Sequence, residues 1–188
     1  GGTFDPIHNG HLRLAQEALE QCDLAGVRII PAGTPPHRDG PHATAEQRLE
    51  MARLALRHNA ALLLDDREIR RGGPSYTGDT VRSLRAEQPL CLLLGGDAFL
   101  QLDTWHEWKQ LFALAHIVVM QRNGRPLGNA IEQADAALLG EYRARLAPAP
   151  RALHEAPAGA VVVLDMPTLE ISATAIRSHC AQGHSPRY

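Results

Sequence analysis

The first twelve residues, Gly1–Leu12, constrain the fold of this chain more than any other segment. Two glycines, an Asp-Pro pair and two histidines three positions apart come directly before apolar residues at helical spacing. Glycine lets the backbone approach a ligand, and a helix N-terminus offers free N–H groups with a partial charge of about +0.5. His8 and His11 can add hydrogen bonds or full positive charge. The segment therefore predicts a phosphate-binding loop, although neither Gly-x-Gly-x-x-Gly nor Gly-x4-Gly-Lys-Ser/Thr occurs in the chain.

Strand and helix patterns alternate along the rest of the chain. Strands are predicted at 27–31, 62–64, 90–94, 117–120 and 161–164, and helices at 10–24, 44–58, 77–87, 131–146 and 172–180, with helical turns at 98–102 and 107–114 and a loop at 148–159. Thr44 and Gln47 form the pattern of a capping box at the start of one helix. This alternation predicts a single α/β domain with a doubly wound parallel sheet. In such sheets ligands bind beyond the carboxyl ends of the strands, where the candidate motifs lie.

Composition and charge exclude several classes of protein. The 188 residues suit one globular domain, and the net charge of −2 gives no general attraction to nucleic acid or anionic membranes. No apolar run reaches 18 residues and no signal peptide is visible, so we expect a cytoplasmic protein with no membrane partner. Cys22, Cys91 and Cys180 lie far apart, and we expect free, buried thiols. No His/Cys/Asp cluster has the spacing of a structural zinc site.

A second candidate motif lies near the other end of the chain, in Ile171–Arg177. Ser172 is a good N-cap, and Thr174 and Arg177 are three residues apart, so they share one face of a helix. Hydroxyl groups, a helix N-terminus and the planar fork of a guanidinium suit a phosphate group. The alternative is an ordinary capped helix with a surface arginine.

Two further regions follow predicted strands. Prolines stiffen the loop at 31–38 and expose His37, which could bind a ligand or belong to a surface turn. Gly95 ends a buried strand, so a ligand can approach the backbone there. Asp97 could accept hydrogen bonds from ribose hydroxyls, or it could cap the next helix.

Aromatic and polar residues offer candidates for a flat acidic ligand. Trp105 could stack on a ring, or it could pack in the core. Backbone N–H groups near Tyr76 and Thr77 could hold a carboxylate.

The motif Gly-x-Phe-x-Pro-x-His-x-Gly-His resembles the signature of the nucleotidyltransferases related to class I aminoacyl-tRNA synthetases. The fuller string Gly-Gly-Thr-Phe-Asp-Pro-Ile-His-Asn-Gly-His resembles one branch, the nicotinate-nucleotide adenylyltransferases of bacterial NAD synthesis. Residues 171–177 resemble that family's Ile-Ser-Ser-Thr-x-Ile-Arg, with Ala173 in place of the second Ser. Residues 31–38 resemble the family's Pro-x-x-x-Pro-Pro-His-Lys. Pro-Ser-Tyr-Thr at 74–77, Gly-x-Asp at 95–97 and Thr-Trp at 104–105 also match motifs of the family.

The resemblance implies a Rossmann-like nucleotidyltransferase fold, a strand ahead of Gly1 and further residues after the C-terminal helix. It implies that the phosphate of nicotinate mononucleotide attacks the α-phosphorus of ATP, giving deamido-NAD and pyrophosphate. Mg²⁺ would arrive with ATP and keep several waters. We expect a monomer or small homo-oligomer.

The resemblance also implies roles for individual residues. Catalysis would rest on His8, His11 and Arg177. ATP would be bound by Gly2, Thr3, Phe4, His8, His11, Gly95, Asp97, Ser172, Thr174 and Arg177. Nicotinate mononucleotide would be bound by His37, Tyr76, Thr77 and Trp105.

Other residues are expected to have ordinary structural roles. Arg48 is expected at the surface, although the family often has arginine there, while Met51 and Leu54 are expected to face the core. The residues 65–68 are expected to be solvated strand ends.

Three other functions remain open from the sequence. The first is an adenylyltransferase that acts on phosphopantetheine or nicotinamide mononucleotide. The second is a fragment of a class I aminoacyl-tRNA synthetase, for which the chain is short, carries the wrong charge for tRNA and lacks a Lys-rich second motif. The third is a non-catalytic nucleotide-binding module, which would have little need of two phosphate-binding segments.

Overall fold

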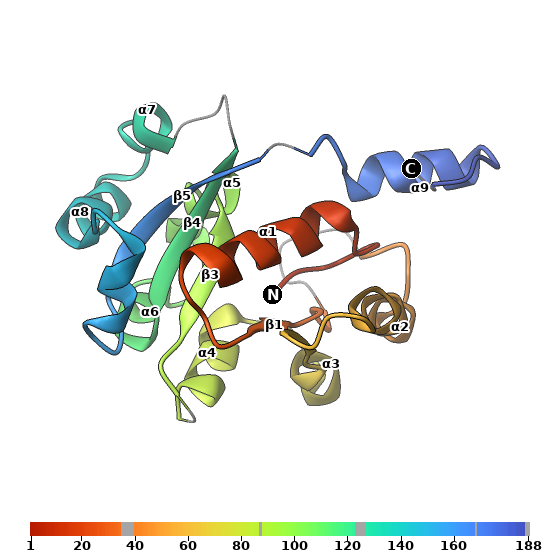
Figure 1. The fold of residues 1–188 in the computed structure, drawn as a ribbon, viewed down its shortest axis with the longest axis horizontal. Coiled ribbons are helices and arrows are strands. Elements are labelled where there is room, and N and C mark those ends of the chain that lie inside the picture. Colours follow the sequence, from red (N-terminus) through yellow and green to blue (C-terminus); the bar gives the residue numbers. More distant parts are fainter. Residues whose placement is uncertain (35–39, 87, 123–126, 168, 187–188) are drawn as a thin grey trace. The chain divides into compact units, whose positions relative to one another are not determined.

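The computed structural model describes residues 1–34, 40–86, 88–122, 127–167 and 169–186. The chain forms two compact units (Figure 1). Unit 1 comprises Gly1–Leu19, Leu24–Ser75 and Leu169–Tyr188, and unit 2 comprises Glu20–Asp23 and Tyr76–Thr168.

Unit 1 contains a small parallel sheet. Strand β1 (Val27–Ile29) pairs in parallel with β2 (Leu62–Leu64). Gly2 continues this arrangement, because its N–H donates to the carbonyl of Ile30 at 3.1 Å and its own carbonyl accepts from Ala32 at 2.9 Å. The loop after Gly2 and the loop after β1 therefore leave from the same, carboxyl edge of the sheet.

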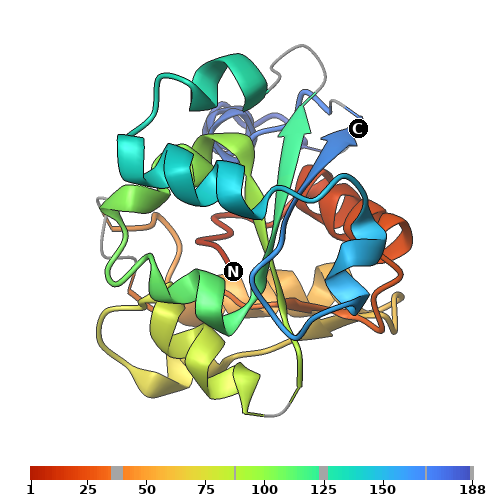
Figure 2. The same cartoon turned by 90° about the vertical axis from the view of Figure 1, so that its left-hand side faces the viewer.

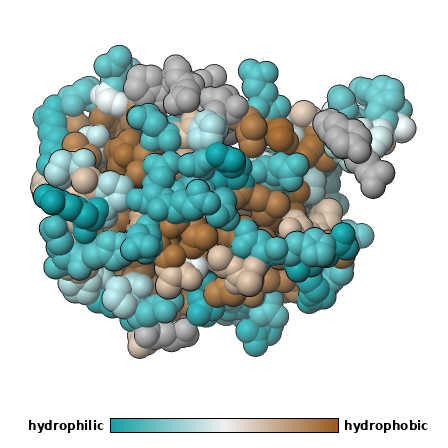
Figure 3. All heavy atoms as spheres, in the orientation of Figure 1, coloured by the Kyte–Doolittle hydropathy of each residue, from teal (hydrophilic) through white to brown (hydrophobic). Residues whose placement is uncertain are grey.

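Four helices belong wholly or largely to unit 1. They are α1 (Asn9–Gln21), α2 (Ala45–Leu56), α3 (Arg67–Arg71) and α9 (Ala173–Ala181). Helix α1 is amphipathic: it buries Ala15 and Ala18, and hydrophilic residues lie along the side that Figure 3 presents. At the start of α2 the predicted capping box is confirmed, since Thr44 and Gln47 exchange both side-chain-to-backbone bonds.

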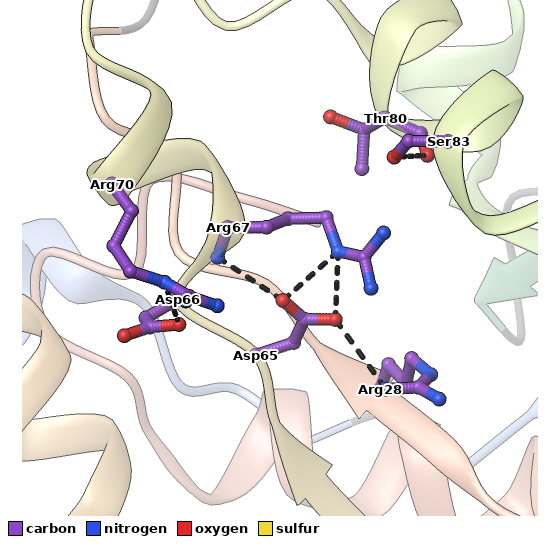
Figure 4. A network of polar contacts seen from close by, with 7 residues as sticks. All are labelled: Arg28, Asp65, Asp66, Arg67, Arg70, Thr80 and Ser83. Carbon is purple, nitrogen blue, oxygen red and sulfur yellow. Dashed lines mark hydrogen bonds and ion pairs between the residues drawn. The ribbon is translucent and has the colours of Figure 1, made fainter.

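A polar network follows β2 (Figure 4). The Asp65 carboxylate accepts from the backbone N–H of Arg67 at 3.1 Å and from its Nε at 2.9 Å, and lies 3.5 Å from a nitrogen of Arg28. Asp65 and Glu68 are both buried. The expectation that residues 65–68 are solvated strand ends is therefore wrong for Asp65 and Glu68, whereas the side chain of Asp66 is 40% exposed, and α3 begins at Arg67.

Unit 2 is built on a three-stranded parallel sheet. Strands β3 (Cys91–Gly95), β4 (His116–Arg122) and β5 (Val161–Met166) lie in the order β3-β4-β5, and Figure 2 shows β4 beside β5. Consecutive residues 117–119 of the middle strand are completely buried, as expected for a strand covered on both faces. The helical elements are α4 (Thr77–Arg85), α5 (Gly96–Phe99), α6 (Gln110–Leu114), α7 (Leu127–Ile131), α8 (Ala136–Arg145), and the short 3-10 turns Leu102–Thr104 and Pro150–His154.

The α/β class with parallel strands is confirmed, and the differences from expectation have local causes. The helix expected at 131–146 begins only at Ala136, because Asp135 caps α8 by accepting from the N–H groups of Ala137 and Leu138, and Ile131 is instead the last residue of α7. Leu54 was expected in the core but is 54% exposed. The single domain over residues 1–188 stays a prediction.

The three cysteines are free. Burial raises the pKa of the Cys22 and Cys91 thiols to about 11, whereas Cys180 is exposed, contrary to expectation. Within the ranges described, no helix is both long and apolar enough to cross a membrane.

Candidate active site

The loop between Gly2 and α1 has an unusual backbone. Phe4 has a φ of 50°, in the left-handed region that bulky residues rarely adopt, and its side chain is buried. The Phe4 ring meets the ring of His11 edge-on, with centroids 5.0 Å apart. The Asp5-Pro6 peptide bond is cis. The loop therefore has a defined shape that aromatic packing supports.

The two predicted histidines lie together at the start of α1. Their rings stack with centroids 3.7 Å apart. The backbone N–H of His8 donates to Nδ1 of His11 at 3.2 Å, so the proton of a neutral His11 ring is assigned to Nε2. Burial, and then the nearby charge of His8, lower the pKa of His11 to about 4. At pH 7 His11 thus offers a neutral N–H donor rather than a positive charge.

Gly10 is required by this stacked pair. A Cβ atom at Gly10 would lie 3.0 Å from Nδ1 of His8 and 3.1 Å from the neighbouring ring carbon. Because the ring of His8 already stacks on His11, it has little room to move. The absence of a side chain at Gly10 therefore leaves the space that the ring of His8 occupies.

The structure brings the C-terminal motif to this loop. Arg177, on α9, donates from Nη1 to the carbonyl oxygen of Asp5 at 2.6 Å and lies 3.9 Å from the Asp5 carboxylate. Arg177 also donates to Oγ1 of Thr174 at 3.3 Å, so the predicted shared face is confirmed. Ser172 caps α9, accepting from the N–H of Ala175 at 3.1 Å. Two segments from opposite ends of the sequence thus meet.

The sequence analysis missed two residues that hold the loop. Asp5 is 8% exposed, and its carboxylate accepts from the backbone N–H groups of His42 at 2.8 Å and Ala43 at 3.1 Å. Arg48 is 1% exposed and donates to the carbonyls of Thr3 at 2.7 Å and Gly33 at 3.0 Å. The expectation of a surface arginine is therefore wrong.

A signal for Arg48 was present in the sequence. Arg48, Ala52 and Leu56 follow one another at intervals of four and are the buried residues of α2. This spacing places the arginine on the same helix face as two apolar residues. A charge on a buried face needs a partner, and here the partners are backbone carbonyls.

The candidates near β3 lie in unit 2. Gly95 ends β3 and is the N-cap of α5, so the alternative in which Asp97 caps this helix is wrong. Asp97 is exposed and borders a cavity of about 400 Å³. The cavity is lined by Gly96, Asp97, Leu100, Leu127, Asn129, Ala130 and Gln133. The carboxylate is thus accessible to a ligand.

The aromatic candidates also lie in unit 2. Tyr76 is the N-cap of α4, which begins at Thr77, and its ring lies 4.9 Å from that of His106, a residue the sequence analysis did not single out. Trp105 is half-buried against the apolar core, as the packing alternative proposed. His37 lies outside the described residues.

Comparison with known proteins places the chain in a class of enzymes. Residues 1–179 match the model of the cytidylyltransferase-like family, so the chain belongs to that family. Two solved structures share the fold: a Plasmodium falciparum nicotinic acid mononucleotide adenylyltransferase complexed with NaAD, and the same protein complexed with APC. They give TM-scores of 0.67 and 0.65 at 15% and 14% identity, and the matches cover 98% of this chain and 83% and 84% of theirs.

Bacterial relatives give a finer assignment. The chain is 48% identical to a protein of Marinobacter nauticus and 49% identical to one of Dechloromonas aromatica, over 100% of this chain and 87% and 88% of theirs. A protein of Halorhodospira halophila is 47% identical over 100% of this chain and 85% of its own length. Each is named "probable nicotinate-nucleotide adenylyltransferase". The chain belongs to the nicotinate-nucleotide adenylyltransferase family.

Proposed function

We propose that the protein transfers AMP from ATP to nicotinate mononucleotide, forming deamido-NAD and releasing pyrophosphate. Its near-50% identity with bacterial relatives of that name supports this activity. The structural observation that carries the proposal is the bond from Arg177 to the Asp5 carbonyl. It joins the histidine loop and the C-terminal motif in one unit, and both are suited to phosphate.

The reaction needs little covalent help from the protein. A phosphate oxygen of nicotinate mononucleotide attacks the α-phosphorus of ATP, and the bond from that phosphorus to the bridging oxygen breaks. The electron pair leaves on pyrophosphate. The attacking oxygen is already an anion at pH 7, so no general base is required, and Ser172 need not act as a nucleophile. Catalysis then consists of positioning and of neutralising charge on the phosphates.

We assign the phosphate contacts to unit 1. The backbone N–H groups of Thr3 and Phe4, after Gly2, would bind the phosphates together with His8 and the Nε2–H of His11. At the other segment Ser172, Thr174 and Arg177 would stabilise the departing pyrophosphate. Arg177 keeps N–H groups for this role, because its contacts with Asp5 and Thr174 use only part of its donor set.

The remaining assignments rest on the family resemblance. Gly95 and Asp97 would bind ATP, and Tyr76, Thr77 and Trp105, with His37, would bind nicotinate mononucleotide. Among the residues that the structure describes, no group of three or more His, Cys, Asp or Glu could hold a metal ion. On the same resemblance, we propose that Mg²⁺ enters with ATP as part of the substrate.

The setting of the enzyme is also a proposal. A reducing cytoplasm suits the three free cysteines, and the net charge of −2 offers no general attraction to nucleic acid. We expect a monomer or a small homo-oligomer.

The test measures pyrophosphate release from Mg·ATP with each of three acceptors (nicotinate mononucleotide, nicotinamide mononucleotide and phosphopantetheine) and in a control without acceptor. We expect the fastest release with the first, together with deamido-NAD identified by mass spectrometry. A site whose N–H donors bind the carboxylate of nicotinate should discriminate well against nicotinamide mononucleotide, which carries an amide in its place. Faster release with another acceptor would reassign the substrate. No release above the acceptor-free reaction would indicate a binding module instead.

A further inference from the structure

Arg48 is buried close to the phosphate-binding loop without being one of its expected ligands. We propose that Arg48 is a positioning residue: it holds the Thr3–Phe4 peptide so that the Phe4 N–H faces the phosphates of ATP. This inference rests on the proposed function and adds Arg48 as a residue that acts by positioning the backbone of the loop.

The guanidinium of Arg48 is buried between two loops. Its two terminal nitrogens donate to carbonyls on two different loops, those of Thr3 and Gly33, and its Nε is buried without a hydrogen-bond partner among the described residues. Burial lowers the pKa of Arg48, and the negative charges of Asp5 and Glu46 partly oppose this. Burying a charge is costly, and an apolar side chain would fill the same space at lower cost. The two carbonyl contacts are therefore what this arginine supplies.

The peptide between Thr3 and Phe4 links the Thr3 carbonyl to the Phe4 N–H. In a trans peptide the C=O and N–H bonds point in opposite directions. Since Arg48 holds the Thr3 oxygen, the Phe4 N–H must point away from the guanidinium. The donation to Thr3 thus sets the direction of a second group, the N–H that we assign to phosphate.

The backbone of Phe4 is strained. Its φ of 50° is costly for a bulky residue and persists only where the surroundings impose it. Rotation of the Thr3–Phe4 peptide would relieve this strain and turn the N–H away from the phosphates. The bond from Arg48 to Thr3 opposes that rotation.

Gly33, whose carbonyl is the second acceptor of Arg48, is held in place by its neighbours. The N–H of Gly33 donates to Oγ of Ser75 at 3.0 Å, and a Cβ at Gly33 would lie 2.6 Å from the backbone oxygen of Glu68. Gly33 is therefore closely confined. Because both donors belong to one planar group, the fixed position of Gly33 also fixes the direction of the donor to Thr3.

The experiment compares Arg48→Lys, Arg48→Met and Arg48→Ala with Arg53→Ala as the matched control. Arg53 lies on the same helix, but its side chain is 62% exposed in a surface ion pair. We expect kcat with ATP to fall about 10²–10³-fold in the Met and Ala variants, the loss seen when one preorganised donor is removed. Arg48→Lys should fall between them and the wild type, because it keeps the charge but not the fork. The KM for nicotinate mononucleotide should stay near the wild-type value.

Chemical rescue separates positioning from folding. A cavity of about 430 Å³ borders Arg48, so guanidinium can enter the space left in Arg48→Ala. We expect millimolar guanidinium to restore part of kcat in this variant, while sodium chloride and urea do not. An unchanged kcat per folded molecule in the Met variant, or an Ala variant that guanidinium does not restore, would overturn the inference. A wild type that makes no deamido-NAD would overturn the proposed function and this inference with it.

Discussion

Replacing Asp5 should loosen unit 1 by an amount that the structure allows us to estimate. The Asp5 carboxylate accepts from two backbone N–H groups just before α2 and lies 3.9 Å from Arg177. Asp5→Ala removes both acceptors and the negative charge. Asp5→Asn keeps the shape and one acceptor oxygen, so it should have a smaller effect.

The magnitude follows from the two hydrogen bonds. Bonds to a charged group contribute about 1.5–3 kcal/mol each. The N–H of His42 belongs to an exposed residue that water can reach after the change, which reduces the loss. We therefore expect the free energy of unfolding to fall by about 2–4 kcal/mol in Asp5→Ala and about 1–2 kcal/mol in Asp5→Asn. For a chain of this size these losses lower Tm by roughly 5–15 °C and roughly 2–8 °C.

Urea denaturation followed by circular dichroism, with a thermal scan, measures both quantities. Asp66→Asn is the control, because Asp66 forms a surface ion pair with Arg70 at 2.8 Å and is 40% exposed. Such pairs contribute about 0–1 kcal/mol. Our reasoning would be refuted if Asp5→Ala were as stable as Asp66→Asn, or if Asp5→Asn lost more than Asp5→Ala.

Three further predictions concern the loop and its neighbours. His11→Asn keeps an acceptor for the His8 N–H but loses the Nε2–H, so kcat should fall about 10²–10³-fold while Tm is retained. His11→Gln should keep more activity than His11→Asn. Equal activities of the two variants would contradict the donor role of His11. Because the pKa of His11 is lowered to about 4 from 6.5, the unfolded chain binds a proton between these values that the folded protein does not. The stability linked to His11 is therefore complete above pH 6.5 and decreases toward pH 4. Between pH 7 and pH 4.5 the free energy of unfolding should decrease less in His11→Asn than in the wild type. Gly33→Ala places a Cβ 2.6 Å from the Glu68 backbone oxygen and should lower the free energy of unfolding by about 1–3 kcal/mol. If the variant unfolds at the same urea concentration as the wild type, the loop adapts to the Cβ without loss of stability.

The features that could be predicted from the sequence are those written in local patterns. The capping box at Thr44 and the shared face of Thr174 and Arg177 depend on residues three positions apart, and both are confirmed. The apolar run at 117–120, predicted as a strand, likewise lies within β4. Short-range spacing was sufficient in these cases because the interactions themselves are short-range.

The features that were missed depend on contacts between distant segments. Arg48 reaches Thr3, 45 residues earlier, and Asp5 reaches His42, 37 residues later. No local pattern tells which carbonyl or N–H group such a side chain will meet. The neutral state of His11 was also open in the sequence, since it follows from burial and from the bond to the His8 backbone.

Helix α9 differs from the other long helices in that none of its residues is buried. Hydrophobic burial therefore contributes little to its attachment, and polar contacts such as that between Arg177 and Asp5 carry more of it. Segments of this kind open locally at a free energy well below that of global unfolding. If α9 holds pyrophosphate as proposed, we expect this helix to open while the histidine loop stays folded, which would let the product leave without disturbing that loop.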